Sequence, residues 1–157
     1  MVPTNTCLIV TLRALDAENW EACIQLRVTE EQEDFVAKDL YSIAQTRFEP
    51  TWIPLVIYDG DTMVGFIMYD EADYEITRLM IDKAHQGKGY GRSAMELIIE
   101  QFELKLAHPT TSTSYVPANH VAERLYLSLG FCKTGKINDG EVVVQRVLRQ
   151  RRDTDHD

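Results

Sequence analysis

The chain has 157 residues, with 25 acidic and 16 basic side chains and a formal net charge of −9. This length fits one domain with a single hydrophobic core, and 45% hydrophobic with 26% charged residues is ordinary for a soluble globular protein. The acidic balance argues against nucleic acid as a partner, because a nucleic-acid binder needs a positive field to replace phosphate counterions.

The sequence contains no run near the roughly 18 apolar residues that are needed to span a bilayer. Its start lacks the basic region that opens a signal peptide. The three cysteines, Cys7, Cys23 and Cys132, have no metal-ligand spacing and are typical of reduced thiols. We therefore expect a cytoplasmic protein with no membrane partner and no metal site.

The first third of the chain predicts one strand and two helices. The stretch Thr6–Leu12 is rich in β-branched residues and predicts a strand. Apolar residues recur with helical spacing over Ala17–Val28. A second helix is expected to begin at Thr29, where Gln32 three residues later would complete a capping box, and to continue through Ile43.

The remaining elements alternate in a way that predicts an α/β fold. The expected elements are strands at Ile53–Tyr58, Thr62–Tyr69, Tyr74–Ile81, Thr110–Val116, Phe131–Ile137 and Glu141–Leu148, and helices over Met95–Leu106 and Asn119–Leu129. This order favours a mixed sheet with helices on both faces. No linker or low-complexity tract divides the sequence, so we expect one domain over residues 1–148 and a polar tail over 149–157.

Three glycines alternate in the segment Gln86–Arg92, which follows the strand Tyr74–Ile81 and opens the next helix. The first amide N–H groups of a helix have no intrahelical partner and carry partial positive charge. Glycines among them let an anion approach the backbone without meeting a Cβ atom, and Lys88 and Arg92 add positive side chains. The segment therefore predicts a pyrophosphate-binding site, although its spacing matches neither a P-loop nor a dinucleotide fingerprint.

The full pattern Gln86-x-x-Gly89-x-Gly91 resembles the Q/R-x-x-G-x-G/A signature of the GNAT superfamily of acyl-CoA N-acyltransferases. The strand before it and the later segment Asn119–Tyr126 are also similar to that superfamily. The resemblance implies the GNAT fold, in which a mixed, mostly antiparallel central sheet has helices on both faces and splayed central strands. It also implies a β-bulge near Arg78–Met80 and acetyl-CoA as the co-substrate.

The resemblance assigns most of the cofactor contacts to backbone groups. Those of Met80 and Ile81 would pair with the pantetheine arm like an added strand, and Asn119 would bond to the pantetheine. Amides in Gln86–Gly91 would hold the pyrophosphate. The expected cofactor-binding residues are Met80, Ile81, Gln86, Gly87, Lys88, Gly89, Tyr90, Gly91, Arg92, Asn119 and Tyr126.

Acetyl transfer to an alkyl amine, by direct attack in a ternary complex, places two demands on the site. Such an amine has a pKa near 10.4, so only about one molecule in a thousand is neutral at pH 7 and a proton acceptor is needed. The thiolate that leaves is best protonated as it departs. The resemblance places Tyr126 near the thioester sulfur as the candidate acid. Glu75, at the start of the strand that feeds the cofactor slot, is the candidate base, and Asp73, Glu71 and solvent are alternatives.

Four acidic residues stand together where the second helix is expected to begin. They are Glu30, Glu31, Glu33 and Asp34. They either complement the macrodipole of a capped helix start or line the acceptor site and bind a cationic amine.

Several stretches resemble bacterial diamine and spermidine N-acetyltransferases, which implies a polyamine such as spermidine or spermine as the acceptor. These stretches are Gln32–Ala37, Tyr41–Gln45, Val64–Tyr69 and the glycine segment. Such relatives often have an aromatic residue where this chain has Glu75, so the base and the acceptor stay open. A peptide or protein amine, an amine drug, and a non-catalytic acetyl-CoA-binding sensor are the alternatives. We expect a homodimer.

Overall fold

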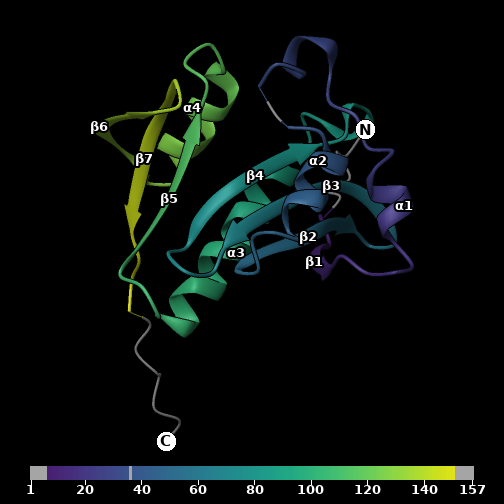
Figure 1. Ribbon diagram of the computed structural model, residues 1–157, viewed down its shortest axis with the longest axis horizontal. Coiled ribbons are helices and arrows are strands. Elements are labelled where there is room, and N and C mark those ends of the chain that lie inside the picture. The colour runs from purple at the N-terminus through teal and green to yellow at the C-terminus, as the bar shows by residue number, and fades with distance from the viewer. Residues whose placement is uncertain (1–6, 36, 151–157) are drawn as a thin grey trace, which may run out of the picture.

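The protein is described by a computed structural model over residues 7–35 and 37–150, and within these ranges seven strands form one mixed sheet (Figure 1). The order across the sheet is β1-β2-β3-β4-β5-β7-β6. The strands are β1 (Val10–Ala14), β2 (Trp52–Asp59), β3 (Thr62–Asp70), β4 (Glu75–Ile81), β5 (Thr110–Tyr115), β6 (Cys132–Asn138) and β7 (Glu141–Val147). The helices are α1 (Trp20–Cys23), α2 (Asp39–Gln45), α3 (Tyr90–Lys105) and α4 (His120–Ser128), with short 3-10 turns η1 (Glu30–Gln32) and η2 (Lys83–His85). None of the helices in these ranges is both long enough and apolar enough to cross a bilayer.

The two halves of the sheet meet at one short parallel contact between β4 and β5. Among the described residues, Glu75 pairs with Ser112 and Ile76 with Thr113, whereas the other neighbouring strands are antiparallel. Beyond Ile76 the two strands diverge and open a wedge (Figure 1). The predicted mixed, mostly antiparallel sheet with splayed central strands is confirmed, and the divergence leaves room for a ligand between the strands.

A β-bulge at Thr77 bends β4 where it leaves β5. The register of β3 against β4 skips Thr77, which has no residue opposite it. Its hydroxyl donates a hydrogen bond of 3.1 Å to the carbonyl of Met68 and so closes the gap in the ladder. The bulge lies one residue before the predicted range Arg78–Met80, and its added twist turns the strand away from its parallel neighbour.

Apolar side chains cover both faces of the sheet, as the sequence predicts. On one face, α3 and α4 bury Ile98, Phe102 and Tyr126 in one core. On the other face, Cys23 of α1 and Ile43 of α2 pack in a second core against β2 and β3. Helices on both faces therefore hold β3 and β4 in place, and β4 lines the site.

The first strand and the first helix differ from their predictions. The strand expected over Thr6–Leu12 begins at Val10, and Thr6 lies outside the described residues. The helix expected over Ala17–Val28 is confined to α1, because the chain after it is held by contacts across the fold. The backbone N–H of Arg27 donates to the carboxylate of Asp82, after β4, at 2.9 Å.

The capping box predicted at Thr29 is wrong. The Thr29 side chain makes no capping hydrogen bond, and the turn that follows is η1 rather than a long helix. The side chain of Gln32 bonds to Gln86 instead of closing the box. The second helix begins only at Asp39. A tertiary contact therefore replaces the local one that the sequence pattern favours.

Candidate active site

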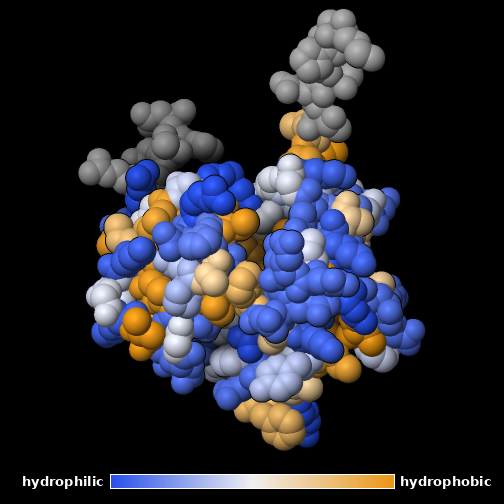
Figure 2. Space-filling view, turned by 90° about the horizontal axis from the view of Figure 1, so that it is seen from above, coloured by the Kyte–Doolittle hydropathy of each residue, from blue (hydrophilic) through white to orange (hydrophobic). Residues whose placement is uncertain are grey.

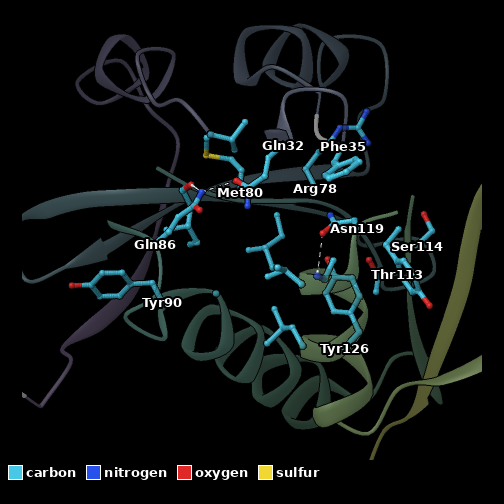
Figure 3. A pocket seen from close by; sticks show the side chains of 18 of the residues that line it. Gln32, Phe35, Arg78, Met80, Gln86, Tyr90, Thr113, Ser114, Asn119 and Tyr126 are labelled. Atoms are coloured by element: carbon cyan, nitrogen blue, oxygen red, sulfur yellow. Dashed lines mark hydrogen bonds between the residues drawn. The ribbon is translucent and has the colours of Figure 1, made fainter. Parts of the chain in front are cut away.

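The wedge between β4 and β5 holds a cavity of about 370 Å³, which reaches from the start of α3 to α4 (Figure 3). Its lining residues come from these four elements, from the turn before α3, from Val28, Gln32, Phe35 and Ala37, and from Glu141 of β7. Seen from above the splayed strands, the surface is hollowed between two halves of the molecule, and apolar side chains show there among hydrophilic ones (Figure 2). A concave, partly apolar site with a few convergent polar groups is typical of cofactor binding.

The start of α3 closes one end of the cavity. Gly87 and Gly89 have φ angles of +76° and +88°, a left-handed conformation that strains other residues. The backbone N–H of Ser93 donates to the carbonyl of Gly89 at 3.1 Å, which opens the helical ladder. The N–H groups of residues 90–92 therefore have no acceptor within the helix. Together with the helix dipole they suit an anion such as pyrophosphate.

The side chain of Gln86 joins three parts of the site. Its amide nitrogen donates a hydrogen bond of 2.9 Å to the carbonyl of Ile81 at the end of β4. The same nitrogen donates a hydrogen bond of 2.7 Å to Oε1 of Gln32 in η1 (Figure 3). Gln86 therefore fixes the glycine segment to the strand and to the opposite wall of the cavity.

Every predicted cofactor-binding residue except Lys88 and Arg92 lines the cavity. Lys88 is exposed, and the guanidinium of Arg92 turns toward α4, where it bonds to the hydroxyl of Ser128. The ring of Tyr90 borders the cavity, but its hydroxyl points away and donates to Asp59 (Figure 3). The anion-binding character of this end therefore rests on backbone N–H groups more than on basic side chains.

The edge of β4 that faces the wedge has no strand partner beyond Ile76 in the part of the chain that the structure describes. Met80 and Ile81 lie on this stretch and line the cavity. Gly65 of β3 allows the two strands to lie close, because a Cβ atom there would lie 2.4 Å from the carbonyl oxygen of Met80. An extended ligand can pair with this edge as an added strand does, which is what the predicted pantetheine contacts require.

Asn119 and Tyr126 close the other end of the cavity (Figure 3). Oδ1 of Asn119 accepts a hydrogen bond of 3.2 Å from the N–H of Ala122 and caps α4, so its NH2 group is the part that can donate to a ligand. Burial raises the pKa of Tyr126 to about 12, the Thr113 hydroxyl opposes this rise, and the Glu141 carboxylate adds to it. Tyr126 is therefore a protonated phenol at neutral pH, as a proton or hydrogen-bond donor must be.

Glu75 lies in a neighbouring hollow rather than in the cavity that holds Tyr126. The two spaces share Thr113 and Ser114 of β5 as a common wall. Burial raises the pKa of Glu75, and nearby carboxylates, chiefly that of Asp73, add to the rise. A carboxylate with a raised pKa is better suited to accept a proton near neutral pH.

Glu141, the first residue of β7, is the only carboxylate that lines the cavity in the described part of the chain. The hydroxyl of Ser114 donates a hydrogen bond of 3.2 Å to its Oε2. Nothing in the local sequence singles out Glu141: the turn at 138–140 places it at a strand start, and the pairing of β5 with β7 brings it to the wedge. Arg78 and His85 also line the cavity, and the sequence predicts no binding or catalytic role for either.

The four acids predicted to bind the acceptor lie on the surface beside the cavity. They are Glu30, Glu31, Glu33 and Asp34, all exposed. The first three line a separate hollow together with Arg27 and Lys83. Gln32 and Phe35, from the same segment, line the cavity itself (Figure 3). The segment thus forms a wall of the site, and uncharged side chains form its inner side.

Comparison with known proteins agrees with this geometry. A sequence model of the acetyltransferase (GNAT) family matches residues 15–131. The chain is 25% identical over 150 residues to the spermine/spermidine N(1)-acetyltransferase of Bacillus subtilis (strain 168), which covers 88% of this chain and 99% of that protein.

Two solved structures illustrate the likeness of the fold. The spermidine N-acetyltransferase from Vibrio cholerae in complex with CoA and spermine has a TM-score of 0.66 at 20% identity, over 87% of this chain and 92% of the other. The ribosomal-protein-S18-alanine N-acetyltransferase from Escherichia coli has a TM-score of 0.69 at 19% identity, over 94% and 99% of the two chains.

Proposed function

The chain belongs to the acetyltransferase (GNAT) family and is an acetyl-CoA-dependent N-acetyltransferase, and we propose that its acceptor is a polyamine such as spermidine or spermine. The observation that carries the proposal is the likeness to the spermine/spermidine N(1)-acetyltransferase over 99% of that protein. A net charge of −9 supports it, because an acidic protein attracts cationic ligands.

We propose that acetyl-CoA binds in the wedge, where the groups present fit its parts. The N–H groups at the start of α3 suit the pyrophosphate, the open edge of β4 at Met80 and Ile81 suits the pantetheine arm, and Asn119 can donate to the same arm. When bound, acetyl-CoA supplies the acetyl group as an activated thioester.

In the proposed mechanism Tyr126 donates to the sulfur that leaves. A thiol ionises near pH 8.5, well below the pKa of about 12 that burial gives Tyr126. The phenol therefore stabilises the developing thiolate as a hydrogen-bond donor, and it does not end the reaction ionised. As the amine nitrogen bonds to the carbonyl carbon, the carbon–sulfur bond breaks and the departing thiolate takes up a proton from water.

We propose Glu75 as the group that accepts the proton of the amine. It stands across the shared wall of Thr113 and Ser114 from Tyr126, and water in that hollow can relay the proton to it. The alternatives Asp73 and Glu71 are exposed in the turn before β4 and line neither the cavity nor the neighbouring hollow.

A panel of amines with acetyl-CoA, followed by thiol release, tests the proposed function. We expect spermidine and spermine to be acetylated faster than a monoamine or a peptide with an α-amine. A preference for the peptide would overturn the polyamine acceptor, and no thiol release with any amine would favour a sensor of acetyl-CoA.

A further inference from the structure

Glu141 lies between the two groups proposed for proton transfer. It is half-buried and lines the cavity together with Tyr126. Its charge contributes to the raised pKa of Tyr126 on one side and of Glu75 on the other. A charge that acts on both groups lies close to the place where the acetyl group is transferred.

The registers of the strands put Glu141 on the same face of the sheet as Glu75. Ser114 is paired with Val143, and alternate residues of a strand share a face, so Glu141 points to the side of Ser114. Ser112, also on that side of β5, is paired with Glu75. An amine held by Glu141 would therefore reach the centre from the face opposite the one that carries α4.

The other charged groups near the cavity are not placed to bind a cation inside it. The guanidinium of Arg78 donates to the carbonyl of Thr77 at 2.7 Å and to Oε1 of Gln45 at 3.0 Å, which directs it toward α2. The exposed acids of residues 30–34 lie outside the cavity lining. A cation that enters the cavity thus meets the carboxylate of Glu141.

The carboxylate of Glu141 is held but not neutralised by its neighbour. Ser114 donates to Oε2 at 3.2 Å, which leaves Oε1 as the atom that can accept from an ammonium group. A hydrogen bond between two charged groups is stronger than a neutral one, and more so in a half-buried site than in water.

We propose that Glu141 binds an ammonium group of the acceptor beside the reaction centre and that Ser114 positions its carboxylate for this contact. The inference rests on the proposed function, because it takes the acceptor to be a cationic amine. Glu141 is then the residue inside the cavity that determines specificity for a cationic acceptor, because the exposed acids of residues 30–34 do not line the cavity.

Steady-state kinetics of Glu141→Gln test this role, since the substitution keeps the shape of the side chain and removes its charge. We expect the KM for spermidine to rise about tenfold or more, as loss of a charge-assisted bond predicts, while the Kd for acetyl-CoA changes by less than about twofold. Glu49→Gln, which neutralises an exposed carboxylate after α2, is the matched control and should leave both values unchanged. Ser114→Ala should raise the same KM about threefold, and Ser114→Thr, which keeps the hydroxyl, should restore it.

Two results of these measurements would contradict the proposed role of Glu141. A KM within about twofold of wild type for Glu141→Gln, or an equal loss of affinity for acetyl-CoA, would overturn the role of Glu141. The kinetics use spermidine or, if the wild type acetylates another amine of the panel faster, that amine. If that amine is not a polyamine, the proposed acceptor fails while the comparison of Glu141→Gln with Glu49→Gln still decides this inference.

Discussion

The thiol of Cys23 donates a weak hydrogen bond to Oδ2 of Asp39 across 3.8 Å, where α1 and α2 meet the sheet. Both residues are buried, with Asp39 5% exposed. A thiol is a poor donor, so the carboxylate is not fully compensated. Burial raises the pKa of Asp39 to about 7; the Cys23 bond and the Arg27 charge oppose the rise.

This pair predicts how stability depends on pH. Asp39 has a higher pKa in the folded than in the unfolded chain, so its contribution to stability is complete below its ordinary pKa of 3.8 and is lost as the pH rises through about 7. Asp39→Asn should therefore have a higher free energy of unfolding than the wild type, and this gain should be larger at pH 8 than at pH 4 by up to about 4 kcal/mol. Urea unfolding at the two pH values measures this. The exposed Asp34→Asn is the control, and an equal gain at both pH values would contradict the prediction.

The glycine at the start of α3 should be essential for cofactor binding. Gly89→Val forces a branched side chain into a φ of +88°, which strains the segment and displaces its N–H groups. Acetyl-CoA should raise the melting temperature of the wild type by mass action and fail to do so for the variant. Gly60→Val, in the β2–β3 turn with φ +57°, is a matched control for strain and should keep the shift. A shift retained in Gly89→Val would place the pyrophosphate elsewhere.

Much of the fold could be predicted because strands and long helices carry their period in the local sequence. The run Val64–Tyr69 and the helix that contains Met95 and Phe102 are where the pattern indicates. The segment between β1 and β2 was not predictable in this way. Its conformation is decided by distant partners, such as Asp82 for the N–H of Arg27, and no periodicity encodes such partners.

In the candidate site, too, the features that depend on local sequence could be predicted, and those that depend on distant partners could not. The glycine segment is local, so its resemblance to the GNAT superfamily and the acetyl-CoA cofactor that it implies are confirmed by the family match. Glu141 is remote in sequence and enters the site only through the pairing of β5 with β7. The exact place of the bulge, at Thr77, also depends on a side-chain bond across strands, so the resemblance to the GNAT superfamily implied it only to within one residue.

Tyr126→Phe tests the donor to the leaving sulfur. The substitution keeps the ring packed and removes only the hydroxyl, so kcat should fall by about a hundredfold while the Kd for acetyl-CoA changes little. Tyr115→Phe is the matched control, because its ring also lines the cavity but its hydroxyl donates to Glu123 at 3.0 Å. If both variants lose the same activity, packing rather than the phenol of Tyr126 explains the loss.

The raised pKa of Glu75 predicts the acidic limb of the rate profile. A base must be ionised to act, so kcat/KM should rise with pH over a window above the ordinary pKa of 4.5 as Glu75 loses its proton. Glu75→Gln should remove this rise and lower the plateau. Asp73→Asn, which removes the neighbouring charge that raises the pKa of Glu75, should keep the limb but move it to lower pH. A profile that Glu75→Gln does not alter would assign proton removal to another group or to water.

The exposed acids of residues 30–34 give the last prediction, which concerns long acceptors. The hollow lined by Glu30, Glu31 and Glu33 shares Val28 with the main cavity. A polyamine whose reacting end lies at Tyr126 can extend its far ammonium groups toward that hollow, whereas a monoamine cannot. Neutralising Glu30, Glu31, Glu33 and Asp34 together should therefore raise the KM for spermidine more than the KM for a monoamine.

Screening by salt distinguishes the contribution of these exposed acids to acceptor binding from the contribution of Glu141. Contacts between exposed charges weaken with added salt much more than contacts in a half-buried cavity, so the difference between spermidine and the monoamine should shrink as salt is raised. A variant with the same change in net charge, in which the exposed Glu18, Glu21, Glu49 and Asp61 are neutralised, controls for the overall field. Equal effects of the two variants would mean that the acids of residues 30–34 act only through net charge. A KM for spermidine unchanged in the first variant would leave acceptor binding to the cavity alone.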